Sequence, residues 1–497
     1  MSFYPLSKTL VAGVLFVLAA TLALPAQSDD ARYQKLENEV NALRQQLSAL
    51  QEQHARELAE LKVMLQKQSV VTTTVVVAQA PATGTGQAAA PSAATMAAAP
   101  APQSLYDSLK QSAEALVPEA VAGKGADLDL SVVLDTYLYH DTADEAGTLP
   151  TRMSGFKSAG DSDGPDNGFN LREVELGLSG EVDPYFRAWA TVSVNEDSAG
   201  FEEAVLQTTS LPYGFTLSGG KIKSGIGRLN RQHSHVWDFV DAPLVYRAMF
   251  GDEGLSDDGV QLTWLAPTPF YLLFGTEVFN GDNDPSFNDL SDDHDELPSH
   301  DAPRLYTAFM KTGPDLGPNH ALQFGLSGLS GRHEVWDEEE EGGASGESRI
   351  FGTDFVYKYD AMRSHGDGDV IVQGEYFYRD QDLDHTVAAW EDMPAWTASQ
   401  DGYYVQGLYG FLPRWRTGLR WDQVGLVNNV NTPEEDDLAC EESYRLTSVL
   451  DWKFSEFSLL RLQAGRGWYA TDDGRENAWE FALEWQVTFG KHPAHDF

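Results

Sequence analysis

The most regular stretch of the chain runs from residue 477 to residue 489, where apolar and polar residues alternate without a break. A period of two is that of a β-strand with one apolar face and one polar face. Aromatic-rich apolar faces are typical of the lipid-facing strands of outer-membrane barrels. One parity holds Trp479, Phe481, Leu483, Trp485, Val487 and Phe489, and the other holds Ala478, Glu480, Ala482, Glu484, Gln486 and Thr488.

The same alternation predicts sixteen strands in the region 126–497, and an even number is expected of a closed bacterial barrel. The predicted strands are 128–139, 169–182, 186–194, 202–209, 215–223, 260–265, 270–279, 305–311, 321–329, 350–359, 370–379, 403–411, 415–423, 444–454, 457–468 and 477–489.

The predicted connections alternate between short and long. Tight turns such as Asp183-Pro184 and Pro267-Thr268-Pro269 follow most even-numbered strands, because proline cannot continue a ladder. Long acidic stretches follow most odd-numbered strands, the longest being 280–301, 332–349, 380–400 and 424–443. Outer-membrane barrels have short periplasmic turns and long outer loops. The predicted fold class is therefore an all-β, 16-stranded antiparallel transmembrane β-barrel, preceded by a periplasmic α-helical coiled coil.

The residues before the barrel divide into three segments. Residues 1–26 read as a secretory signal peptide, with Lys8 ahead of an apolar run. Residues 30–66 predict a coiled coil, with a solvated single helix as the alternative, since their apolar residues recur in steps of four and three. Residues 67–125 predict a low-complexity periplasmic linker with a short helix near 105–116.

The net charge of the chain limits the kinds of molecule that it can bind. The formal net charge of −42 disfavours nucleic acid, because binding to phosphates requires a basic surface. The single cysteine, Cys440, can form no intrachain disulfide, and its acidic neighbours disfavour a catalytic thiolate.

Two passages resemble the phosphate-selective porin (O/P-type) outer-membrane family. They are Phe169-Asn170-Leu171-Arg172-Glu173-Val174-Glu175-Leu176-Gly177-Leu178-Ser179-Gly180, and Leu211-Pro212-Tyr213-Gly214-Phe215-Thr216-Leu217-Ser218-Gly219-Gly220-Lys221-Ile222-Lys223. The resemblance implies a sixteen-stranded trimeric channel with a loop folded into it. Its phosphate ligands find no residue-by-residue match here, so phosphate specificity is not carried over.

The loop after the fifth predicted strand is locally basic. If it folds inward, as in that family, its cations line a constriction and favour anions; the alternative is an ordinary surface loop. Lys221 and Lys223 share parity with Phe215 and Leu217, so they face the lumen only if Gly219-Gly220 forms a bulge. The constriction candidates are Lys221, Lys223, Arg228, Arg231 and Arg247.

Strand parity also predicts a basic track on one inner wall, near the C-terminal end of the barrel. Its alternative is mutual neutralisation by the acidic residues Asp422, Asp451, Glu480 and Glu484 on the same wall. The track candidates are Arg414, Arg416, Arg420, Arg445, Lys453 and Arg461.

The outer loops carry dense carboxylates, which indicate solvated charge or, alternatively, binding of divalent cations that bridge to lipopolysaccharide. The motif His233-Ser234-His235 offers two imidazoles, fewer than the three or four ligands of a zinc site, so no metal site is predicted. No cofactor is predicted, and the common catalytic motifs are absent from the sequence.

These patterns predict an outer-membrane porin of a Gram-negative bacterium, not an enzyme. It would pass small polar or charged solutes by passive diffusion, with outer-membrane lipid, lipopolysaccharide and two further copies of the chain as partners. Two alternatives remain open from sequence. One is a structural envelope tether that uses the coiled coil in the periplasm, and the other is a gated uptake receptor.

Overall fold

A computed structural model describes residues 128–490, except for 144–145, 157–163, 196–197, 292, 338–340, 433–437 and 473. The predicted signal peptide, coiled coil and linker lie outside these described residues, and so does the C-terminal Phe497.

The described chain is a succession of strands with a few single-turn helices. The strands are β1 (Leu128–Asp141), β2 (Gly168–Asp183), β3 (Phe186–Val194), β4 (Ala199–Thr208), β5 (Phe215–Lys223), β6 (Ser256–Leu265), β7 (Tyr271–Phe279), β8 (Leu305–Gly313), β9 (His320–Asp337), β10 (Gly342–Tyr359), β11 (Val370–Ala388), β12 (Trp396–Leu412), β13 (Trp415–Asn431), β14 (Leu438–Ala439), β15 (Ser443–Ser455), β16 (Ser458–Thr471) and β17 (Gly474–Gly490). The helices are η1 (Leu149–Thr151), η2 (Pro212–Gly214), η3 (Ser234–Val236), α4 (Leu244–Met249) and η4 (Ser364–Gly366).

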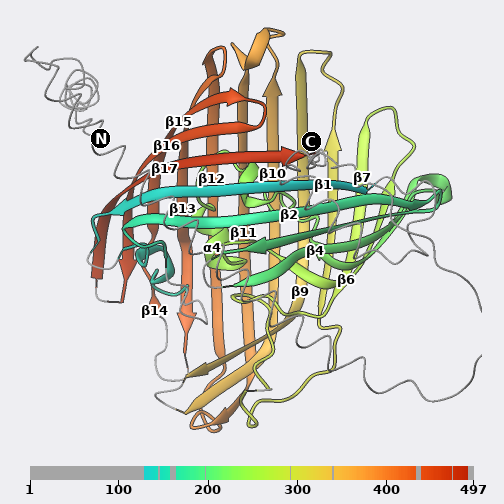
Figure 1. Ribbon diagram of the computed structural model, residues 1–497. Helices are drawn as coiled ribbons and strands as arrows, with labels where there is room; N and C mark the ends of the chain where they lie inside the picture. The colour runs from blue at the N-terminus through green and yellow to red at the C-terminus, as the bar shows by residue number, and fades with distance from the viewer. Residues whose placement is uncertain are drawn as a thin grey trace, which may run out of the picture. The chain divides into compact units, whose positions relative to one another are not determined.

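The strands form one closed antiparallel ring. Each strand pairs with its neighbours in sequence, and β1 also pairs with β17 over eleven residue pairs, from Ser131↔Gly490 to Asp141↔Glu480. In Figure 1, β1 and β17 lie side by side along this seam. Of the seventeen strands, β14 is a two-residue addition to β13, so the ring itself has sixteen. The predicted sixteen-stranded barrel is confirmed.

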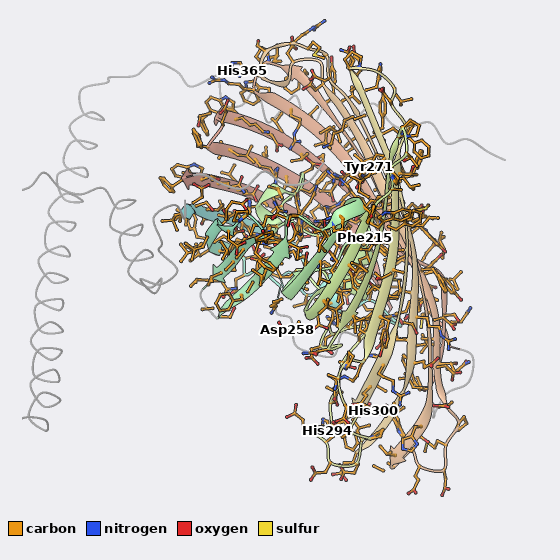
Figure 2. All side chains as sticks on the ribbon, turned by 90° about the vertical axis from the view of Figure 1, so that its right-hand side faces the viewer. Phe215, Asp258, Tyr271, His294, His300 and His365 are labelled. Atoms are coloured by element: carbon orange, nitrogen blue, oxygen red, sulfur yellow. The ribbon has the colours of Figure 1, made fainter. Side chains whose placement is uncertain are left out.

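Short and long connections are segregated to opposite ends of the barrel. Figure 2 shows His365, from the short connection between β10 and β11, at one end. His294 and His300, from the long connection between β7 and β8, lie at the other. Connections that alternate along the sequence therefore lie at opposite ends of the barrel, which we call the short-turn end and the long-loop end.

Three stretches predicted as long loops are largely strand. β9 continues to Asp337 and β10 begins at Gly342, and β11, β12 and β13 likewise extend into 380–400 and 424–431. The extensions pair with one another through backbone hydrogen bonds. These extensions still bury side chains, with Ala344, Leu383 and Trp390 packed together, but the buried residues also include small and polar ones such as Ser345 and Glu334. The apolar alternation used for prediction is therefore lost there.

The two faces of each strand differ in chemistry. On β17, Trp479, Phe481, Leu483, Trp485 and Phe489 are 41–57% exposed, whereas Ala478 and Glu484 are 1% exposed. All of the other fifteen ring strands also expose at least one large apolar side chain; β16, for example, exposes Leu462. The described part of the barrel is therefore apolar outside and polar inside, as predicted.

Aromatic side chains mark two levels on the outer face. Near the short turns, Trp415 stacks on Trp452 with ring centroids 5.3 Å apart. Nearer the long loops, Tyr444 stacks between Trp421 (5.5 Å) and Trp468 (5.2 Å). Trp415 and Trp421 are six residues apart on one strand, or about 20 Å at about 3.3 Å per residue. Girdles of aromatic residues bound the apolar band of outer-membrane barrels, although that band is about 25 Å tall and its strands are tilted.

The lumen holds the segment 224–255 between β5 and β6, which we call the inner loop. Its single α-helix, α4, is six residues long and contacts β11, β12 and β13 from inside the ring (Figure 1). Leu244, Val245, Tyr246 and Phe250 are buried there, and Phe250 packs edge-on against Phe377 of β11 at 5.1 Å. No helix in the described part of the chain is long and apolar enough to cross a membrane.

Candidate functional site: the inner loop and the barrel wall

The inner loop begins with a sharp bend fixed by its neighbours. Gly227 has a φ of +54°, and a Cβ there would collide with the Glu375 carboxylate and the Tyr246 hydroxyl. Only glycine combines this backbone conformation with so close an approach. The bend turns the chain from the wall at β5 into the lumen.

Glu375 of β11 anchors the first turn of the inner loop. This side chain, 3% exposed, accepts hydrogen bonds from the backbone N–H groups of Arg228 (2.7 Å) and Leu229 (2.9 Å). It also accepts from the hydroxyls of Tyr246 (2.9 Å) and Tyr404 (2.6 Å). One buried carboxylate therefore joins the loop, α4 and two wall strands.

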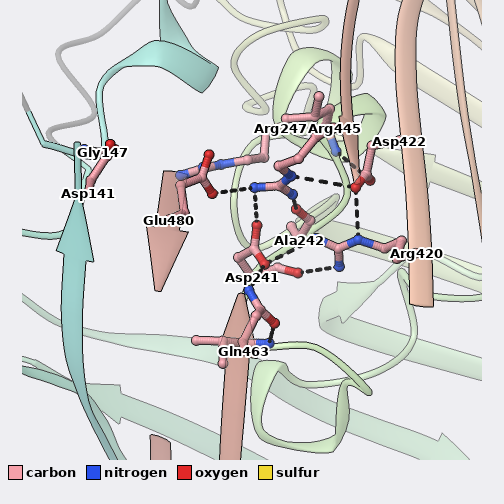
Figure 3. A network of polar contacts seen from close by, with 12 residues as sticks. Asp141, Gly147, Asp241, Ala242, Arg247, Arg420, Asp422, Arg445, Gln463 and Glu480 are labelled. Carbon is pink, nitrogen blue, oxygen red and sulfur yellow. Dashed lines mark hydrogen bonds and ion pairs between the residues drawn. The ribbon is translucent and has the colours of Figure 1, made fainter. Parts of the chain in front are cut away.

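Asp241 anchors the middle of the inner loop to the next strands around the ring, β13, β15 and β16 (Figure 3). Its carboxylate lies 2.5 Å from Arg445 of β15 and 3.0 Å from Arg420 of β13, and it accepts a 2.7 Å hydrogen bond from Gln463 of β16. Burial alone would raise the pKa of Asp241, but Arg445 and Arg420 hold it well below its usual value. Asp241 is therefore ionised and locked to the wall.

The arginines at Asp241 belong to a larger network of buried charges. Asp422 lies 3.0 Å from Arg420 and 3.5 Å from Arg445, and Glu480 lies 3.1 Å from Arg445. Nearer the short turns, Arg416 pairs with Asp238 of the loop (2.6 Å) and with Asp451 (2.5 Å). Arg461 pairs with Asp451 (2.9 Å) and Glu484 (3.0 Å).

The predicted basic track is thus divided in two. Arg416, Arg420, Arg445 and Arg461 point inward, but wall carboxylates and the inner loop neutralise them. Arg414 and Lys453 are exposed at the short-turn end, where Arg414 donates to the Phe454 carbonyl at 2.7 Å. Strand parity predicts the inward direction of Arg416, Arg420, Arg445 and Arg461. It does not predict that two aspartates of the inner loop, Asp238 and Asp241, pair with them.

The constriction candidates also lie in different surroundings. Lys221 pairs in register with Asp258, on the parity of the outward-facing Leu217, and pairing of β5 with β6 is continuous, without a bulge at Gly219-Gly220. Lys223 is buried and donates to the Glu253 carbonyl at 3.0 Å. Arg247 pairs with Asp252 at 2.5 Å.

Arg228 and Arg231 instead line a cavity at the short-turn end. The cavity is ≈ 550 Å³ in volume and is also lined by Lys311, His320 and Asp315. Lys311 of β8 lies 2.8 Å from Asp354 and also donates to the Gly227 carbonyl. Sequence reasoning did not single out Lys311, although its inward parity on a predicted strand was a usable signal.

A larger cavity of ≈ 1450 Å³ opens on the same end, beneath the residues around Asp238. Its charges balance, with Arg414, Arg416, Lys453 and Arg461 against Asp129, Asp238, Asp369 and Glu456. The smaller cavity carries three Lys and Arg side chains against one carboxylate. The two cavities therefore differ in formal charge.

The acidic connection between β7 and β8 is more structured than solvated charge would require. Arg304 pairs with Asp282 at 2.7 Å and with Asp289, and Phe287 is buried. Ser286 donates to the Met249 carbonyl at 2.6 Å, so this connection packs onto the inner loop. In the described residues, the clusters with metal-ligating geometry lie elsewhere, at the start of the inner loop and on β2 and β4.

The chain is 40% identical over 344 residues to an uncharacterized protein of Aquifex aeolicus (strain VF5), a match covering 66% of this chain and 70% of that protein. No family model matches. Among solved structures, the outer-membrane channel DcaP of Acinetobacter baumannii is 14% identical, with 74% of this chain and 98% of that chain covered and a TM-score of 0.49. An anion-selective porin from Comamonas acidovorans is 11% identical, with 73% and 100% covered and a TM-score of 0.46.

Proposed function

Since the chain belongs to the same family as the uncharacterized Aquifex aeolicus protein, whose name assigns no activity, we propose its function from its own residues. We propose that it is an outer-membrane porin that admits small polar or charged solutes by passive diffusion and favours anions. The observation that carries the proposal is the inner loop, which crosses the lumen of a closed barrel and narrows it.

The outer surface supports a location in the outer membrane. Exposed apolar side chains form a contiguous face, and such faces mark contact with lipid or with a partner. Aromatic side chains stack at two levels of this face, as they do in the girdles of outer-membrane barrels. We place the short-turn end in the periplasm, together with the predicted coiled coil at 30–66.

The smaller cavity supports preference for anions. Because wall arginines are neutralised by carboxylates, they add little net field to the lumen. The lining holds Arg228, Arg231 and Lys311 with one carboxylate, Asp315; Lys311 is paired with Asp354 behind the lining, which leaves two arginines with one aspartate and a small positive excess. A low-dielectric passage lined by one sign of charge concentrates ions of opposite sign.

The test is conductance of the purified protein in a planar bilayer, with the reversal potential measured across a salt gradient. We expect discrete steps in groups of three, as the predicted homotrimer requires, and a reversal potential of anion-selective sign. Arg231→Glu should move that potential towards cation selectivity, whereas Arg466→Gln, on the outer face over Trp479, should leave it unchanged. Absence of conductance at every voltage would reject the porin, and cation selectivity of the wild type would reject the anion preference.

A second prediction concerns the lipid face. Leu419 of β13 is 59% exposed between the two aromatic levels, so Leu419→Arg places a charge within the apolar band. We expect a loss of about 2–4 kcal/mol in the free energy of unfolding from lipid vesicles. Leu426→Arg on the same strand, beyond Trp421, should cost at most about 1 kcal/mol. Equal losses at both sites would argue against the assigned membrane boundary.

A further inference from the structure

Two histidines of the inner loop lie among four glutamates of the barrel wall. His233 immediately precedes η3 and His235 lies within it, Glu173 and Glu175 lie on β2, and Glu202 and Glu203 lie on β4. We call these six residues the His–Glu cluster. The histidine pair alone was too small a ligand set for a metal site, and the fold supplies the missing carboxylates.

Ligand atoms of the cluster lie close together in two groups of three residues that share Glu175, one with His233 and Glu202 and the other with His235 and Glu173. His233 Nδ1 is 2.6 Å from a Glu202 oxygen and 3.7 Å from a Glu175 oxygen, and His235 Nδ1 is 2.8 Å from that same Glu175 oxygen. In a tetrahedral zinc site with bonds of about 2.0–2.1 Å, neighbouring ligand atoms are about 3.3 Å apart. The observed separations bracket this value, so small side-chain movements would admit an ion.

The surrounding contacts are those that hold metal ligands in position. His233 Nε2 lies 3.1 Å from Glu203, and a carboxylate on the second ring nitrogen is the usual support of a metal-bound imidazole. Glu173 accepts from Ser193 at 2.9 Å and from Ser234. Gln486 of β17 donates to the His235 carbonyl at 2.6 Å, which fixes the turn that carries both imidazoles.

Charge and burial favour a cation at this place. His233, His235, Glu173 and Glu175 are each less than 9% exposed. Of the four carboxylates, Glu202 has one nearby lysine, Lys223 at 3.8 Å. Buried carboxylates require compensating positive charge. Imidazole nitrogens with carboxylate oxygens suit first-row transition ions, whereas Mg²⁺ and Ca²⁺ prefer ligand sets of oxygen alone.

We propose that His233, Glu175 and Glu202 form a binding site for a divalent transition-metal ion of the zinc type, with Glu203 supporting the His233 imidazole and with His235 and Glu173 beside the shared ligand Glu175. The site joins the inner loop to β2 and β4, on the wall away from Asp241. A bound ion would thus fasten the part of the loop that the buried arginine network does not reach. The proposal stands whether or not the barrel conducts.

The experiment measures Zn²⁺ bound to the full-length, detergent-solubilised protein without a polyhistidine tag. The protein is stripped with EDTA, dialysed against ZnCl₂ and then against metal-free buffer, and its zinc content is determined by mass spectrometry. The test variant is His233→Gln/His235→Gln, whose amides keep a polar group at each position. The control is His140→Gln/His385→Gln, which also removes two histidines, both exposed.

We expect the wild type and the control to retain one zinc ion per chain more than the test variant. Glu203→Gln should weaken binding by about 10–100-fold, the usual effect of removing a supporting carboxylate. A Co²⁺-loaded wild type should show the intense visible absorption of a four-coordinate ion, a readout that does not depend on any variant folding. Equal zinc content in all variants, or a wild type that retains none, would overturn the proposal.

Discussion

Arg445→Met is expected to be among the most destabilising single substitutions in the barrel wall. Arg445 is fully buried and lies within 3.5 Å of Asp241, Asp422 and Glu480. Methionine keeps much of its volume but none of its charge, so three carboxylates would share Arg420 as their nearest remaining cation. Loss of one partner from a buried charge network costs about 3–5 kcal/mol.

The measurement is urea-induced unfolding from lipid vesicles, followed by tryptophan fluorescence. A matched control is Arg466→Met, because Arg466 lies on the outer face over Trp468 and Trp479. That substitution should cost about 1 kcal/mol or less, the range of exposed ion pairs and cation–π contacts. If the two variants were equally stable, Arg445 would not be the centre of the network. The double variant Arg445→Met/Asp241→Asn should recover part of the loss, since one of the stranded charges is removed.

Glu375→Ala is expected to free the first turn of the inner loop and to alter conduction as well as stability. Two backbone N–H groups and two tyrosine hydroxyls lose their acceptor in a buried site. Each buried group left unsatisfied costs about 1–3 kcal/mol, so the four groups together predict a loss of at least about 4 kcal/mol. The loop should then fluctuate, which predicts noisier and larger single-channel currents.

The conservative variant separates charge from hydrogen bonding at this position. Glu375→Gln keeps one carbonyl acceptor and should retain roughly half of the anchoring, with smaller changes in current. Glu347→Gln is the matched control, because Glu347 is exposed on the extension of β10 and forms an ion pair with the neighbouring Arg349. Wild-type currents from Glu375→Ala would show that the anchor at Glu375 does not hold the loop in place.

The strands of the barrel wall could be predicted from the sequence, whereas the contacts inside the barrel could not. The period of two placed all sixteen strands, and parity assigned Arg416, Arg420, Arg445 and Arg461 to the lumen, because side-chain direction on a strand follows from local geometry. The partners of these arginines could not be read in the same way. Asp238 and Asp241 reach them from about 180 residues away through an irregular loop, whose path no short-range pattern encodes.

The His–Glu cluster was also only partly predictable from sequence, for the same reason. His233 and His235 were recognised as a pair, yet the ligands that complete the set come from β2 and β4, some 30 to 60 residues earlier. The extensions of β11 to Ala388 and of β10 back to Gly342 were missed for a different reason. Their buried residues include glycine, serine and glutamine, so the apolar alternation fades while backbone pairing remains.

The seam between β1 and β17 determines when this molecule can become complete. The two strands are separated by more than 300 residues, so their eleven residue pairs are among the last contacts available to a chain made from its N-terminus. Until then the growing sheet has two bare edges, each a template for pairing with another unfinished chain. The ring can therefore close only after the whole chain has been made. Until then its two unpaired strand edges can associate with other chains, and this is the period in which chaperones are needed.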